Sequence, residues 1–157
     1  MLRFIGLAAS LCLAANAAAA QGPALTPAPL PPAIEAPRDV PFPGVIELSV
    51  DATDVARGIF RVRETIPAAP GRMTLLYPNW IPGHHAPRGA IEKVAGLVIR
   101  ANGRELDWTR DDIDMTAIHV FVPQGARNLD LEFQFLSATE ASEGRIVATT
   151  QLLNLQW

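Results

Sequence analysis

The chain has 157 residues, a length that suits one folded domain. Hydrophobic residues make up 49% of it, enough for a core, and the formal net charge is -3 at pH 7. This composition gives no basic footprint, so nucleic acid is not an expected partner.

The first twenty residues are predicted to be a secretory signal peptide. Arg3 precedes an apolar stretch, and the run Ala18–Ala20 before Gln21 forms a small-residue cleavage site. Cleavage near Ala20 would remove Cys12, the sole cysteine, and leave a mature chain without disulfides or a thiol nucleophile. Such an exported chain fits a bacterial periplasm or secretion and has no expected membrane span. An uncleaved anchor is the alternative, although the stretch is short for a span.

Residues 21–43 are predicted to be an extended linker, because eight of the fourteen prolines fall there with few large apolar residues. The folded domain is expected over residues 44–157. Its sequence alternates with a period of two, most clearly in LDLEFQFL, where Leu129, Leu131, Phe133 and Phe135 share one face. Alternation of this kind predicts half-buried strands.

Further strand-like runs are VIELSV, IFRVRETI, RMTLLYP, AGLVIRA, RELDW, AIHVFVP and RIVATTQLLNLQ. Asn102-Gly103 lies between two of them and predicts a tight hairpin, since both residues tolerate positive φ. Trp108 is expected in the core. The predicted fold is an all-β antiparallel sandwich of about seven to eight strands. The apolar run that ends on Trp157 suggests that the domain is truncated there.

The histidines do not have the spacing of a metal site. The chain contains no HExxH, in which a helical turn brings two imidazoles onto one zinc ion. His84 and His85 are adjacent, so on an extended chain they point to opposite sides. His119 is out of phase with its apolar strand neighbours and is expected to face solvent or a second layer. A small metal-binding protein that uses these three histidines is kept as a weaker alternative, and no metal ligand or catalytic residue is assigned.

The acidic run RDDID also lacks a recognisable site pattern. Asp111, Asp112 and Asp114 come without the glycine and distal glutamate of a calcium-binding loop. A solvated turn is therefore the expected structure.

The stretch YPNWIPGHHAPRG, residues 77–89, combines three prolines, two glycines and a tryptophan. Its Pro-x-Trp-x-Pro-Gly pattern, followed by Arg88, resembles the corresponding loop of the N-terminal β domain of M61 peptidases, the glycyl aminopeptidases. The strand order around the loop, with KVAGLVIRA and NGRELDW behind it, extends the resemblance over residues 44 to 157. His85 departs from the family's usual tyrosine, and Gly89 from the acidic residue that often follows the arginine.

The resemblance implies a longer protein in which a thermolysin-like zinc domain with HExxH follows this domain. Such enzymes are zinc aminopeptidases that remove small N-terminal residues, particularly glycine. The zinc would lie only in that downstream catalytic domain, which would be the partner of this chain and would alone contact peptide substrate. The chain by itself is expected to be inactive.

The carried-over loop residues are expected to be structural or to lie at a domain interface. They are Pro78, Trp80, Pro82, Gly83, His85 and Arg88. Trp80 is expected to anchor the corner in the core, Pro82-Gly83 to turn the chain, and Arg88 to pair with a carboxylate within the domain or across to the catalytic domain. The rival hypothesis is a free-standing periplasmic β-sandwich that binds a ligand or protein through this loop.

Overall fold

A computed structural model describes residues 27–30, 33–34, 36, 40–80, 82–83, 85–138 and 147–154. The chain divides into two units, Met1–Leu30 and Pro31–Trp157. In the first unit only residues 27–30 are described, and they are exposed and lack regular secondary structure. The predicted signal peptide and its alternative as an anchor lie outside the described residues. Among the residues that are described, no helix is long and apolar enough to cross a membrane.

The second unit is built almost entirely from strands, as the alternating sequence predicts. The elements are β1 (Glu47–Asp54), β2 (Ile59–Pro67), β3 (Gly71–Leu76), the 3-10 turn η1 (Ile91–Lys93), β4 (Val94–Ala101), β5 (Arg104–Leu106), β6 (Trp108–Arg110), β7 (Ala117–Val122), β8 (Asn128–Leu136), β9 (Val147–Ala148) and β10 (Leu153–Asn154).

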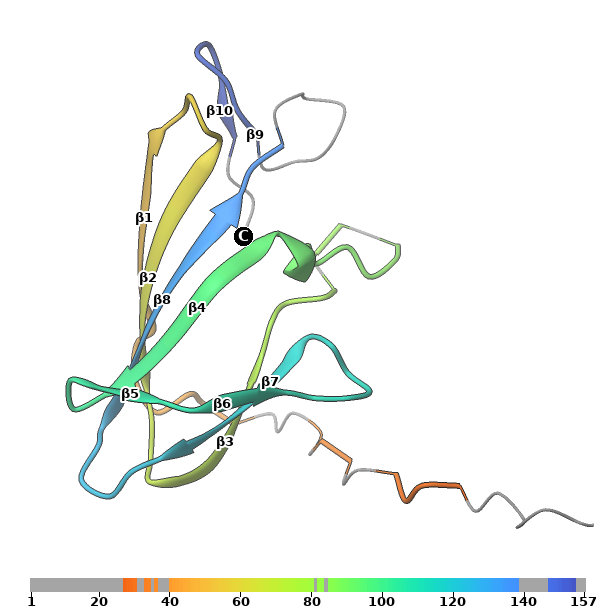
Figure 1. The fold of residues 1–157 in the computed structure, drawn as a ribbon, viewed down its shortest axis with the longest axis vertical. Coiled ribbons are helices and arrows are strands. Elements are labelled where there is room, and N and C mark those ends of the chain that lie inside the picture. The colour runs from red at the N-terminus through yellow and green to blue at the C-terminus, as the bar shows by residue number, and fades with distance from the viewer. Residues whose placement is uncertain are drawn as a thin grey trace, which may run out of the picture. The chain divides into compact units, whose positions relative to one another are not determined.

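The strands form a five-stranded sheet of order β1-β2-β8-β4-β5, a three-stranded sheet of order β3-β7-β6, and the pair β10-β9. Neighbouring strands within each sheet are antiparallel. Figure 1 shows the three-stranded sheet crossing one end of the five-stranded sheet, with β9 and β10 at the other end. The predicted all-β, sandwich-like architecture is therefore confirmed, with ten described strands rather than seven to eight.

Two sequence runs that read as single strands are divided in the structure. RELDW contributes β5 to the five-stranded sheet and β6 to the three-stranded sheet, with Asp107 between them. The run joins the two layers as a strand that switches sheets. RIVATTQLLNLQ is broken at Thr149, whose Oγ1 accepts the N–H groups of Gln151 at 3.2 Å and Leu152 at 2.9 Å. This local turn competes with extension of the strand and produces the short β9-β10 pair.

The Asn102-Gly103 hairpin is confirmed. Asn102 has φ 51° and Gly103 φ 74°, and the turn joins β4 to β5. Two successive positive φ values match the twist of an antiparallel pair.

The inner face of the five-stranded sheet carries two core clusters. The first joins Ile66, Ile99 and Leu129 of this sheet to Ile118, Val120 and Val122 of β7. Phe60, Val62 and Phe135 form the second cluster with Ala148 of β9. Trp108 packs against the first cluster as expected, and its indole Nε1 donates to the Leu97 carbonyl at 3.2 Å.

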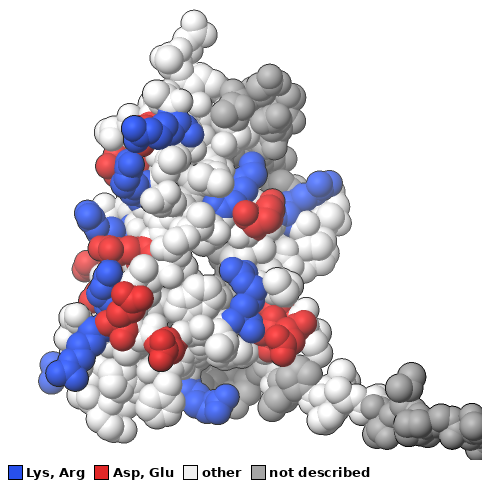
Figure 2. Space-filling model, in the orientation of Figure 1, with Lys and Arg blue, Asp and Glu red and all other residues white. Residues whose placement is uncertain are grey.

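The outer face of the same sheet is charged. Glu132 on β8 pairs with Arg100 on β4 at 3.0 Å and with Arg63 on β2 at 3.4 Å. Near the β1–β2 turn, Asp54 pairs with Arg57 and Arg61, each at 3.0 Å. Figure 2 shows acidic and basic residues interleaved along one side of the molecule, which agrees with this pairing. The alternation in LDLEFQFL thus separates an apolar layer from an ion-paired one.

Candidate functional site

The loop of residues 77–89 leaves the three-stranded sheet after β3 and returns to the five-stranded sheet through η1. Its two ends are held together at Asn79, whose carbonyl accepts the backbone N–H of Arg88 at 2.8 Å and of Gly89 at 3.0 Å. Tyr77 fixes the entry by donating its backbone N–H to the Thr116 carbonyl at 2.9 Å. The loop is therefore closed at its neck.

Gly89 is required at that neck by close contact. A Cβ there would collide with the carbonyl oxygen of Pro78 and would lie 2.8 Å from the Cα of Asn79. Only glycine lets the two backbone segments approach this closely. An acidic residue at this position would need a wider neck, because its Cβ would overlap these backbone atoms.

The motif residues of the loop lie at the surface. Those that the structure describes are Pro78, Trp80, Pro82, Gly83, His85 and Arg88, and all are exposed. The prediction that Trp80 anchors the corner in the core is wrong, because its side chain is 66% exposed. Tyr77, three residues earlier, is partly buried and packs against the second core cluster. Burial, with the charge of Glu92, raises the pKa of the Tyr77 hydroxyl.

The turn predicted at Pro82-Gly83 is confirmed, and Gly83 adopts φ +83°. Arg88 makes no ion pair within the described part of the domain. Its expected pairing with a carboxylate across a domain boundary stays a prediction. His84 lies outside the described residues.

A second group of polar side chains lies on the outer face of the three-stranded sheet. His119 on β7 bonds through Nε2 to Asp111 Oδ2 and through Nδ1 to Thr74 Oγ1 on β3, each at 3.0 Å. The ionised carboxylate can only accept, so Nε2 carries the proton. These contacts place His119 against neighbouring side chains rather than free in solvent.

Asp111 is not in a solvated turn, and that prediction is wrong for this residue. Its carboxylate is 8% exposed and also accepts the backbone N–H groups of Ile113 at 2.9 Å and Asp114 at 2.8 Å. The bond from His119 and these two backbone bonds lower the pKa of the Asp111 carboxyl to about 2. An aspartate that precedes a turn and caps the following N–H groups is the signal that could have identified it.

The described residues do not fit a zinc centre. Among them, no three His, Cys, Asp or Glu side chains converge on a common point. Both ring nitrogens of His119 are engaged, and His85 is exposed on the loop. The hydroxyl, imidazole and carboxylate of Thr74, His119 and Asp111 therefore act as a cross-strand network that holds the loop before β7.

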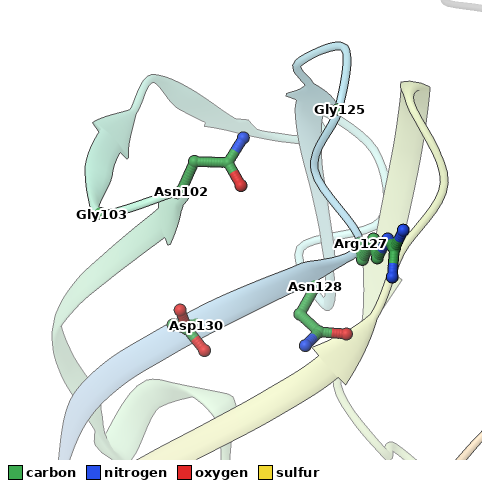
Figure 3. A pocket seen from close by; sticks show the side chains of 6 residues that line it. All are labelled: Asn102, Gly103, Gly125, Arg127, Asn128 and Asp130. Carbon is green, nitrogen blue, oxygen red and sulfur yellow. The ribbon is translucent and has the colours of Figure 1, made fainter.

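A polar depression of about 260 Å³ lies where the β4–β5 turn approaches the start of β8. Its lining is Asn102, Gly103, Gly125, Arg127, Asn128 and Asp130. Figure 3 shows the Arg127 side chain extending away from Asn102. Asp130 is already engaged by the Thr65 hydroxyl at 3.0 Å. This arrangement provides amides and charges but no paired nucleophile and base.

Comparison with known families decides what this architecture is. The peptidase M61 N-terminal domain model matches residues 47–157. The chain belongs to this family. A solved aminopeptidase N family protein from Idiomarina loihiensis is similar to this M61 N-terminal domain, with a TM-score of 0.52 and 22% identity over 59% of this chain. The chain spans only 15% of that protein's length, and no curated protein matches it.

Proposed function

We propose that the chain is the non-catalytic N-terminal portion of an exported M61-type zinc aminopeptidase that acts on small N-terminal residues such as glycine. The observation that carries the proposal is the family match over residues 47–157, which covers the whole strand-built domain. The proposal places the HExxH zinc site and the peptide-binding cleft in a domain that follows, since the 157 residues contain no HExxH.

In this proposal the chain contributes a rigid frame rather than chemistry. The closed neck at Gly89 and the Asp111 network fix two neighbouring loops by internal hydrogen bonds. A zinc ion bound downstream would supply Lewis-acid activation of water and of the scissile carbonyl. Export would follow from the signal-like residues 1–20 and is tested by the N-terminal residue of the mature protein, expected to be Gln21.

The experiment is to read the gene beyond the codon for Trp157. The expected result is an open frame that encodes HExxH. A stop codon at that position, in the native gene, would contradict the proposal.

One observation favours a second candidate, a free-standing periplasmic β-sandwich that binds a ligand or protein. The exposed indole of Trp80 on a loop with a fixed neck is a suitable recognition surface. If the gene ends at Trp157, a pull-down from periplasmic extract that Trp80→Ala abolishes would support this candidate. Equal capture by the wild type and by Trp80→Ala would exclude binding through this loop.

A further inference from the structure

The inner face of the five-stranded sheet is covered at one end by the three-stranded sheet and at the other by β9. Part of this face near β1 is exposed to solvent. Leu48 on β1 lies opposite Glu64 on β2, in the same cross-strand line as Leu131 on β8. Leu48 thus points to the same face as the buried Leu131, yet it is 49% exposed. Ile46, which immediately precedes β1, is 47% exposed. Together these two side chains form an apolar strip that is about half exposed.

Glu64 lies beside this strip, and its carboxylate has no partner among the described residues. Along β2 it stands between Val62 of one core cluster and Ile66 of the other. Its cross-strand neighbours on this face, Leu48 and Leu131, are also apolar. The carboxylate makes no hydrogen bond or ion pair within the described residues. Burial raises the pKa of the Glu64 carboxyl, as expected for a charge that loses water without gaining a cation.

We propose that Ile46, Leu48 and Glu64 form the surface on which the rest of a longer peptidase polypeptide docks. The docking segment covers the apolar strip and brings an Arg or Lys side chain to Glu64. This inference rests on the proposed function, because it needs polypeptide beyond Trp157. We call the three residues the β1–β2 docking face.

Charge complementarity indicates that the occupant carries a cation. A cation that pairs with a partly dehydrated carboxylate offsets part of the cost of its lost hydration. A second copy of the chain fits poorly, since a two-fold contact through this face would bring two Glu64 carboxylates together. The similar solved protein has most of its length outside the matched region, so polypeptide is available there to cover such a face.

The test compares the 157-residue chain with the full gene product, each as wild type, Glu64→Gln and Glu47→Gln. Glu47 is the matched control, because it is exposed on the opposite face of β1. In the full product, Glu64→Gln should speed amide hydrogen exchange of β1 by about tenfold or more, since it leaves the partner's cation unpaired. Glu47→Gln should change it by less than about twofold. In the 157-residue chain, Glu64→Gln should leave Tm unchanged or raise it, because it removes a charge that burial disfavours.

A carboxyl NMR titration gives a second readout that does not depend on a substitution. The Glu64 midpoint should lie above the ordinary glutamate value in the 157-residue chain and below it in the full product. Equal exchange of β1 in the two lengths, with the midpoint still raised in the full product, would overturn the docking face. If the gene instead lacks a downstream HExxH domain, the proposed function fails first and this inference falls with it.

Discussion

Two leucines on the inner face of the five-stranded sheet differ in solvent exposure. Leu129 on β8 is fully buried against the three-stranded sheet, whereas Leu48 on β1 is 49% exposed. Both point the same way, so the difference lies in what covers them. The comparison distinguishes two sets of residues. Leu129, Gly89 and Asp111 stabilise the fold through packing or hydrogen bonds. Leu48, Glu64 and Trp80 are available at the surface for contacts with another polypeptide.

The largest expected effect tests this comparison within one residue type. Leu129→Ala should lower the free energy of unfolding by about 2–5 kcal/mol, because it leaves a cavity in a closed core. Leu48→Ala should cost less than about 1 kcal/mol in the isolated chain, because half of its side chain is already in water. Urea unfolding of the two variants measures both values. Similar losses would mean that the β1 edge is as well packed as the core.

The neck of the 77–89 loop provides the next test. Gly89→Ala should destabilise the domain by about 1–3 kcal/mol, because the new methyl group overlaps the backbone of Pro78 and Asn79. The neighbouring Arg88→Ala should stay within about 0.5 kcal/mol, since its exposed side chain makes no ion pair in the described domain. Chemical denaturation of the two variants measures the free energy of unfolding lost at Gly89 and at Arg88. Equal stability of the two would contradict the tight neck.

Acid should reveal the Asp111 network. The pKa of Asp111 is lowered from 3.8 to about 2, so its contribution to stability is present above pH 3.8 and is lost as the pH falls toward 2. Wild-type Tm should therefore fall more steeply over this range than the Tm of Asp111→Asn. The exposed Asp112→Asn is the control and should follow the wild type. If the Tm of the wild type and of Asp111→Asn depended on pH in the same way, the Asp111 carboxylate would not stabilise the fold as proposed.

The smallest effect is expected at Trp80. With 66% of its side chain exposed, Trp80→Ala should lower the free energy of unfolding by less than about 1 kcal/mol. Trp108→Ala should lower the free energy of unfolding by clearly more, because Trp108 packs on the core and donates a hydrogen bond. Thermal unfolding of the two variants checks the order. A larger loss at Trp80 would restore it as the anchor of the corner.

Local alternation predicted the strands and their faces well. In IFRVRETI the inward set Phe60, Val62 and Ile66 is confirmed, and the same period places Glu64 inward. Alternation could not predict how deeply each inward side chain is buried. Burial depends on a second layer of strands that are distant in the sequence. The division of RELDW between two sheets depends on the same long-range packing.

The candidate loop was predicted in position but not in burial. Proline and glycine identified the turn at Pro82-Gly83 from local backbone preferences. The exposure of Trp80 could not be read from them, because a tryptophan in a loop packs only if the loop folds back. The Asp111 carboxylate was missed for a different reason: its partner His119 lies on the following strand, and their approach depends on the pairing of β6 with β7.

The central proposal is that this M61 N-terminal domain belongs to a zinc aminopeptidase whose catalytic domain follows it in a longer polypeptide. Its most direct test is the release of glycine from a peptide with an N-terminal glycine, by the purified full gene product and by the 157-residue chain. The account predicts release by the full product, its loss on chelation of zinc, and no release by the 157-residue chain. Release by the 157-residue chain alone, or none by the zinc-loaded full product, would contradict it.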